Sequence, residues 1–343
     1  MRSVFADRRI LIGGGCGFLG SYLVPAAVEA GAHVTVVDNL ENGDRPAPGP
    51  AWDRVTFVER DLRERTVCDE VMPGHDLFVN LAARASGVGF SRTHHGEMLV
   101  DNILCGLVPL QAAQRHGVGH VVMTSTSCVY PDDAPIPTPE LDPLLGLPER
   151  VNEGYGWAKR IHELAATYFG REHGLRTTIL RPFNLYGANY PWRSTEKAHV
   201  IPALVKRVLD GEDPLVVWGS GRQRRNFLHG RDAAEVVWRV IASGAEGAVN
   251  VGYEEDTSIA DLAALICDVT GRHPAIVFDI ARPDGQMRKS ADATRLRALT
   301  GDYVPQVTLR EGIEEMVEWY SRTFQEKRFH DRRAGLHGPP GAA

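Results

Sequence analysis

The sequence predicts an α/β protein with a doubly wound parallel sheet, followed by a smaller α/β C-terminal domain. Short apolar runs alternate with helical patterns through the first half of the chain. A glycine-rich turn joins the first of these runs to the first helical pattern. After residue 182 the alternation gives way to loops and separate helical patterns. Such alternation is typical of a parallel sheet whose two faces are covered by helices.

The individual elements follow from hydrophobic periodicity. Strands are predicted over 9–12, 33–37, 55–58, 76–80, 120–123 and 177–180, which are short segments rich in apolar and β-branched residues. Helices are predicted over 17–30, 97–116, 153–173, 199–210, 233–243, 258–270 and 309–324. The helix over 199–210 places its apolar residues Ile201, Leu204, Val205 and Val208 on one face.

Composition limits the class of protein. The 343 residues are 43% hydrophobic and carry a formal net charge of −6, which disfavours a general nucleic-acid or membrane-surface binder. No apolar run approaches membrane-spanning length. The five cysteines are widely spaced and form no CxxC pair, as expected of reduced thiols. We therefore expect a cytoplasmic protein that binds no metal, nucleic acid or membrane.

The turn after the first strand predicts a dinucleotide site. Gly14, Gly17 and Gly20 recur every three residues between strand and helix, which permits close approach of a pyrophosphate to the helix N-terminus. Asp38 ends the second strand and would accept from ribose hydroxyls and repel a 2′-phosphate, so NAD is predicted rather than NADP. The expected cofactor contacts are Gly14, Gly17, Phe18, Leu19, Gly20, Asp38, Asn39, Asp61, Leu62, Leu81, Ala83, Ser125, Tyr155, Lys159 and Phe183.

This motif makes the first half of the chain a Rossmann-type domain. We predict that residues 1–182 bind NAD and that a segment at about 225–250 returns to the same domain. Residues 183–224 and 251–328 are predicted to bind the substrate. Residues 329–343, mostly polar or Gly and Pro, are predicted to form a flexible tail.

Tyr155 and Lys159 are the residues expected to serve redox chemistry. Their i, i+4 spacing places them on one face of a helix. A phenol with a pKa near ~10 is a poor base at neutral pH, but a nearby ammonium and the positive nicotinamide would lower that pKa. The Thr126 hydroxyl, just after a predicted strand, would bind the same substrate oxygen.

Together these residues resemble the extended short-chain dehydrogenase/reductase family that acts on nucleotide sugars. The resemblance runs from Arg9 to about Tyr320 and departs at Gly13, where many members carry Thr. Dehydratases of that family carry an Asp-Glu pair where this chain has Ser127 and Cys128, so the acid needed for water elimination is missing. A thiol, with a reference pKa near ~8.5, suits proton transfer at a carbon beside a ketone.

The resemblance is closest to two subfamilies that share this cysteine, GDP-mannose 3,5-epimerase and GDP-L-fucose synthase. Lys197 matches the catalytic Lys segment of the first, and His199 matches the catalytic His position of the second. Both are therefore candidates for the acid/base opposite Cys128. The resemblance makes the catalytic set Thr126, Cys128, Tyr155, Lys159, Lys197 and His199. The expected substrate contacts are Gly87, Ser91, Ser127, Asn184, Lys197, His199, Val200, Trp218, Arg225 and Arg282, the two arginines suiting a diphosphate.

The cofactor argument favours the epimerase. A consumed NADPH would call for recognition of a 2′-phosphate, which Asp38 disfavours. We therefore expect a homodimeric, NAD-dependent epimerase that inverts C3 and/or C5 of a GDP-linked hexose through a transient 4-keto intermediate. One alternative is an NADPH-dependent 4-keto-6-deoxy-sugar 3,5-epimerase/4-reductase. The other is a non-catalytic NAD-sensing protein, against which the intact Thr126, Tyr155 and Lys159 argue.

Overall fold

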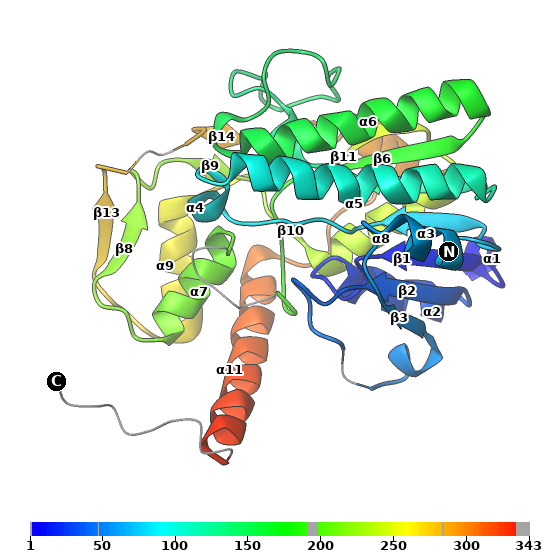
Figure 1. Cartoon of the computed structure of the whole chain (residues 1–343). Helices are drawn as coiled ribbons and strands as arrows, with labels where there is room; N and C mark the ends of the chain where they lie inside the picture. Colours follow the sequence, from blue (N-terminus) through cyan, green and yellow to red (C-terminus); the bar gives the residue numbers. More distant parts are fainter. Residues whose placement is uncertain (1, 47, 191–197, 283–284, 334–343) are drawn as a thin grey trace.

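The computed structural model describes residues 2–46, 48–190, 198–282 and 285–333 (Figure 1). At its centre is a seven-stranded sheet of order β11-β6-β5-β4-β1-β2-β3, and all six of its pairings are parallel. Its strands are β1 (Arg9–Gly13), β2 (His33–Asp38), β3 (Thr56–Glu59), β4 (Leu77–Asn80), β5 (His120–Thr124), β6 (Arg176–Pro182) and β11 (Gly247–Val251). The strand order reverses between β1 and β4, the switch point of a Rossmann sheet. The predicted fold class is confirmed.

Helices cover both faces of this sheet. They are α2 (Gly20–Glu29) and α8 (Gly230–Ser243) on one face, and α3 (Arg65–Val71), α5 (His95–Arg115) and α6 (Glu153–His173) on the other. Ile10 and Ile12 of β1 pack in a core with Trp238 of α8, whereas Leu11 packs in the opposite core with Leu110 of α5. Because both faces are buried, the strand is apolar throughout rather than alternating.

A second lobe lies to the left of the parallel sheet in Figure 1. It contains α7 (Val200–Leu209), α9 (Ile259–Thr270), α11 (Leu309–Arg333) and the ribbon of β8 (Leu215–Trp218) with β13 (Ile276–Asp279). Leu204, Leu262 and Met316 share its separate core. The short strands are β7 (Leu185–Tyr186), β9 (Arg224–Arg225), β10 (Leu228–His229), β12 (Thr257–Ser258) and β14 (Arg288–Lys289), and the short helices are α1 (Arg2–Phe5), α4 (Val88–Ser91) and α10 (Thr294–Thr300).

The predicted helix over 153–173 has the bounds of α6. Strand β11 pairs with β6 at the edge of the parallel sheet. Two features differ from expectation. Leu296 of α10 packs in the core of the parallel sheet, although it lies in the stretch predicted to bind substrate. Helix α11 continues to Arg333, past the predicted end at 324 and into the predicted tail, whose last ten residues lie outside the described chain.

Candidate active site

The glycine-rich turn joins β1 to α2 at the carboxyl edge of the sheet. Gly14 has a φ of 71°, and a Cβ there would lie 2.7 Å from the Ala82 backbone. A Cβ at Gly20 would lie 2.3 Å from the Gly15 carbonyl oxygen, whereas a Cβ at Gly17 would meet its nearest atom only at 3.4 Å. The fold itself therefore requires the first and third glycines. The second leaves the space that a pyrophosphate needs beside the helix N-terminus, so the turn fits NAD.

Asp38, at the end of β2, is held beside this turn. The backbone amide of Cys16 donates to one carboxylate oxygen (2.9 Å) and that of Leu40 to the other (2.8 Å). These two bonds fix a carboxylate where the ribose of a dinucleotide would lie. Such a group accepts from ribose hydroxyls and repels a 2′-phosphate.

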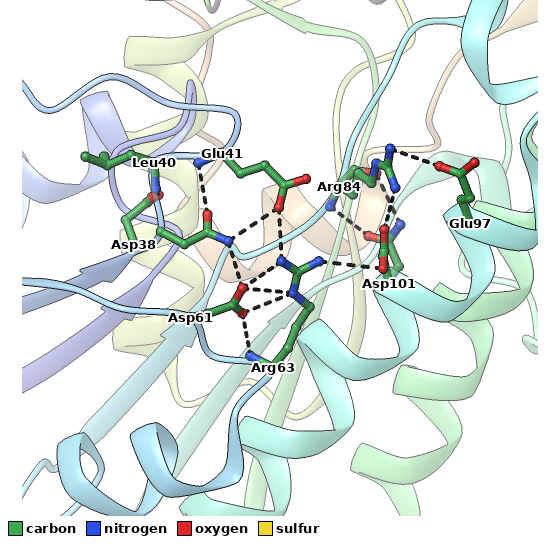
Figure 2. A network of polar contacts seen from close by, with 10 residues as sticks. Asp38, Leu40, Glu41, Asp61, Arg63, Arg84, Glu97 and Asp101 are labelled. Carbon is green, nitrogen blue, oxygen red and sulfur yellow. Dashed lines mark hydrogen bonds and ion pairs between the residues drawn. The ribbon is translucent and has the colours of Figure 1, made fainter.

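A network of ion pairs joins the ends of β2 and β3 to α5 (Figure 2). Arg63 pairs with Asp61 (2.6 Å), Glu41 (3.1 Å) and Asp101 (3.6 Å). Asn39 also donates to Asp61 (3.0 Å). Although burial opposes it, the hydrogen bonds from Arg63 lower the pKa of Asp61. The Asp61 carboxylate, an expected cofactor contact, is thus also paired with Arg63. Two further members of the network are Arg84 and Glu97.

Thr126, Tyr155 and Lys159 come from two elements that pack together. Thr126 follows β5 and accepts from the backbone amide of Cys128 (3.2 Å), which caps the 3-10 turn Ser127–Val129. Tyr155 and Lys159 lie near the start of α6, which contacts that turn. The Lys159 ammonium lies 5.5 Å from the centroid of the Tyr155 ring and donates to the Thr124 carbonyl (2.8 Å).

The protonation of this pair is set by burial. Burial raises the pKa of the Tyr155 phenol, and the Cys128 and Cys105 thiols raise it further. Burial lowers the pKa of Lys159 to about 8. The protein by itself therefore keeps the phenol protonated. The expected lowering of its pKa would need the positive charge of the nicotinamide in addition to that of Lys159.

Cys128 belongs to a cluster that was not predicted from the sequence. Its Sγ lies 3.8 Å from the Nζ of Lys289, which also donates to Glu149 (3.1 Å). Lys289 lies in β14, whereas Glu149 precedes α6. Both side chains are buried, at 8% and 7% exposure. No signal in the sequence could have indicated them, because both lie in segments whose neighbouring residues are mostly exposed, where a charged residue is expected to be solvated.

The charges in this cluster are strongly coupled. Burial and the Glu149 carboxylate raise the pKa of the Cys128 thiol to about 12, although Lys289 opposes them. Burial would raise the pKa of Glu149, but Lys289 and hydrogen bonding lower it to about 2. Burial opposes the charge on Lys289, yet Cys128 and Glu149 raise its pKa. At neutral pH the cluster is therefore a carboxylate, an ammonium and a protonated thiol.

His199 lies immediately before α7. Its backbone amide donates to the Tyr190 hydroxyl (3.3 Å), and the two rings pack edge to face at 5.8 Å. Although its surface is exposed, the surrounding protein and the Lys289 ammonium lower the pKa of its imidazole. His199 thus shares a charged neighbour with Cys128. Lys197, the other candidate acid/base, lies outside the described residues.

A buried ion pair contacts the residues on either side of the turn that carries Cys128. Arg181 of β6 donates to both carboxylate oxygens of Glu163 in α6 (2.9 and 2.5 Å). The Ser125 hydroxyl also donates to Glu163, and the Tyr130 hydroxyl accepts from Arg181 (2.9 Å). Ser125 and Tyr130 flank the turn that carries the reactive hydroxyl and thiol. The ion pair therefore fixes the position of that turn.

Three of the expected substrate contacts lie near the small strands of the second lobe. The Arg282 guanidinium lies 5.0 Å from the centroid of the Trp218 ring, which is 45% exposed. An exposed indole offers a surface on which a base can stack. Arg225 in β9 is the register partner of Lys289 in β14, so it lies next to the Cys128 cluster.

Most of the other expected contacts are buried or half-buried in the protein. Ser91 is 1% exposed and donates to the Ser86 carbonyl (3.2 Å). Phe183 is fully buried, and Asn184 donates to Asn226 (3.3 Å). Gly87, Leu62 and Ser127 are also buried, whereas Phe18, Leu19, Leu81, Ala83 and Val200 are half-buried. Ser91 and Asn184 thus direct side-chain polar groups to other protein groups, and the buried apolar side chains shape the site through packing.

Within the described ranges, no group of three or more His, Cys, Asp or Glu side chains could hold a metal ion. Over the same residues, no helix is both long enough and apolar enough to cross a bilayer.

Comparison with known proteins shows the family of this chain. The NAD dependent epimerase/dehydratase family matches residues 10–252. The chain belongs to this family. A putative GDP-L-fucose synthase 2 from Oryza sativa subsp. japonica is 36% identical to this family member over 248 residues, which are 70% of each chain.

Two solved structures of the same kind are similar over nearly their whole length. UDP-glucose 4-epimerase from Thermotoga maritima, solved with UDP-glucose, is 28% identical with a TM-score of 0.81 and covers 92% of this chain and 99% of its own. UDP-glucose 4-epimerase from Thermus thermophilus, in complex with NAD, is 25% identical with a TM-score of 0.78 and covers 91% and 99%.

This family member is therefore an NAD-dependent enzyme of the nucleotide-sugar epimerase/dehydratase class. The predicted resemblance and the NAD cofactor are confirmed, and the non-catalytic alternative is set aside. Gly14, Gly17, Gly20 and Asp38 would hold NAD, which supplies reversible hydride exchange with carbon when bound.

Proposed function

We propose that this enzyme is an epimerase that inverts C3 and/or C5 of a GDP-linked hexose through a transient 4-keto sugar. The observation that carries the proposal is the Cys128 thiol, which lies two residues after Thr126 and close enough to Tyr155 to raise the pKa of its phenol. Hydride exchange needs no thiol. A thiol beside a redox site suits a second proton transfer, at a carbon next to the new ketone.

The roles of the residues follow from their positions. Tyr155 accepts the proton of the C4 hydroxyl, Thr126 donates a hydrogen bond to the same oxygen, and Lys159 stabilises the phenolate. A ketone at C4 acidifies the C–H bonds at C3 and C5. Cys128 then serves one face of the ring, and a second acid/base serves the other. Lys197 and His199 are the two candidates for that second group.

The state of the cofactor separates this proposal from its main alternative. An NADPH-dependent 4-keto-6-deoxy-sugar 3,5-epimerase/4-reductase is favoured by the relative named as a GDP-L-fucose synthase. Against it stands the fixed Asp38 carboxylate. Arg63, a cation close to that strand end, is already bound by Asp61 and Glu41. Recycled NAD accords better with this arrangement than consumed NADPH.

The substrate contacts belong to the same proposal. Arg225 and Arg282 bind the diphosphate, and Trp218 stacks on the base. Residues 1–182 with 225–250 serve the cofactor, and residues 183–224 with 251–328 serve the sugar nucleotide.

A cytoplasmic homodimer is proposed as well. The homodimer is supported by the exposed apolar side chains of Val100 and Leu104 on α5 and Tyr168 on α6. These two helices pack side by side (Figure 1). Light scattering after size-exclusion chromatography tests it, and a monomer mass at micromolar protein would contradict it.

The decisive experiment follows solvent exchange at carbon. The enzyme is incubated in deuterated water with GDP- and dTDP-hexoses, and C3 and C5 are monitored by NMR. We expect deuterium at one or both carbons with no net change in NADH or NADPH absorbance. Stoichiometric consumption of NADPH would instead establish the reductase, and the absence of exchange with every hexose would refute the epimerase.

Cys128→Ser tests the role of the thiol. We expect NAD binding to be unchanged and exchange to fall at least about a hundredfold, in the range that a positioned acid/base contributes. Cys267→Ser is the matched control, because Cys267 is buried in the core of the second lobe, and its exchange rate should match the wild type. Undiminished exchange in Cys128→Ser would refute the assignment.

A further inference from the structure

We infer that Lys289 and Glu149 are positioning residues that set the protonation state of Cys128: Lys289 stabilises its thiolate, and Glu149 limits that stabilisation. The inference rests on the proposed acid–base role of Cys128. It adds two residues, neither of which touches the sugar in this scheme, that control when the thiol gives up its proton.

The geometry places the Lys289 ammonium close to both an anion and the reactive sulfur. Its ammonium lies 3.1 Å from a Glu149 carboxylate oxygen and 3.8 Å from the Cys128 Sγ. The carboxylate is held in place because the Asn152 amide donates to it (2.7 Å). The backbone of Lys289 is held as well, since its carbonyl accepts from the Asn226 amide (3.2 Å). Both charged side chains are almost fully buried, where charges interact more strongly than in water.

The other groups that face this cluster do not duplicate either role. The Tyr155 phenol faces the thiol, and the Arg225 guanidinium and His199 imidazole face the Lys289 ammonium. Thr126 donates no charge and lowers the pKa of the thiol only through a hydrogen bond. The opposed charges that act on the sulfur are therefore those of Glu149, which raises its pKa, and Lys289, which lowers it.

The chemical consequence concerns both directions of proton transfer. When the S–H bond of Cys128 breaks and the proton goes to the carbon of a substrate enolate, the electron pair stays on sulfur as a thiolate. That anion forms beside the Lys289 ammonium, which neutralises it. Without Lys289 the new anion would face the Glu149 carboxylate alone, and like charges at this depth are strongly unfavourable. In the reverse direction the thiolate takes the carbon-bound proton, and the same ammonium maintains the base.

The test measures thiolate formation without any sugar substrate. Full-length enzyme is alkylated with iodoacetamide at pH 7 to 10, and modification of the Cys128 peptide is followed by mass spectrometry, because the thiolate is the reactive form. At pH 8 we expect Lys289→Met to react about tenfold more slowly than the wild type and Glu149→Gln about tenfold faster, one pKa unit in each direction. Lys289→Arg keeps the charge and should react within about threefold of the wild-type rate.

Opposite shifts distinguish electrostatic control from loosened packing, which would expose the sulfur and speed both reactions. The inference is overturned if Lys289→Met does not slow alkylation, or if both variants shift the same way. Arg288→Met is the matched control, because Arg288 is an exposed neighbour on β14 that pairs with Asp256. Its Cys128 rate should equal that of the wild type. Thermal melting and NAD binding establish that each variant is folded.

A double variant covers the case in which Lys289→Met does not fold. Glu149→Gln with Lys289→Met leaves no lone buried charge, and its alkylation rate should lie between the rates expected for the single variants. A rate outside that interval would overturn the inference. If the alkylation rates shift but no hexose exchanges deuterium, the proposed epimerase is refuted and the control of the thiol by Lys289 and Glu149 is retained. If deuterium exchanges but the alkylation rates do not shift, the epimerase is retained and the inference about Lys289 and Glu149 is refuted.

Discussion

Replacing Glu163 by Gln should lower the free energy of unfolding of the enzyme by several kcal/mol. Glu163 and Arg181 form a buried ion pair whose side chains are 2% and 1% exposed. The neutral amide would leave the guanidinium buried without a counter-charge. Removing one member of a buried pair costs about 3–5 kcal/mol, and retention of the Ser125 hydrogen bond by the new amide oxygen places the expected loss near the lower value, about 3 kcal/mol.

The free energy of unfolding is measured by urea titration, followed by tryptophan fluorescence, which reports on the fully buried Trp238. Glu172→Gln is the matched control, because it makes the same chemical change in the same helix at an exposed ion pair. The Glu172 side chain is 67% exposed and lies 3.8 Å from His173. That change should cost less than about 0.5 kcal/mol.

A double variant tests the cause of the loss. Glu163→Leu with Arg181→Met removes both charges and should cost much less than the sum of the two single changes, because no lone charge remains buried. Two results would refute the reasoning. One is a loss below about 1 kcal/mol for Glu163→Gln, and the other is additivity in the double variant.

Two further predictions concern the cofactor turn and the active-site lysine. Gly20→Ala should weaken NAD binding in calorimetry at least about tenfold, because its Cβ would lie 2.3 Å from the Gly15 oxygen. Gly96→Ala, whose Cβ would meet no atom within 4 Å, should bind normally, and equal affinity of the two variants would contradict the argument. Because burial lowers the pKa of Lys159 to about 8, the unfolded chain binds more protons between that value and its own pKa of ~10.4. The stability of the wild type relative to Lys159→Met should therefore rise from pH 8 to 10 by about 2 kcal/mol, and a flat difference would rule out the shift.

The parts of the fold that depend on local patterns could be predicted from the sequence. Helix α6 has the predicted bounds because its apolar periodicity is long and glycine follows its last residue, in the left-handed conformation typical of a helix end. The cofactor turn could be predicted as well, because its three glycines lie within seven residues of the chain, directly after a strand. Tyr155 and Lys159 are likewise linked by a spacing of one helical turn.

The short strands of the second lobe could not be predicted in the same way. Strands β9 and β14 have two residues each and pair across more than sixty positions of the chain. Two residues carry no periodic signal, and their pairing is specified by the surrounding packing. The ion pair between Arg63 and Asp61 met the same limit, because it forms where the ends of β2 and β3 approach α5.

The sequence by itself determined the alternation of strands and helices, the glycine turn expected to hold NAD, the one-turn spacing of Tyr155 and Lys159, and the presence of a thiol two residues after Thr126. Each depends on residues that are close in the chain, where backbone geometry alone dictates the spatial relation. Only the tertiary structure decided what surrounds that thiol. Lys289 lies 161 positions away from Cys128, and the two meet because a strand of the second lobe packs against the turn after β5. Burial there gives the charges their strength, and burial is a property of the assembled fold.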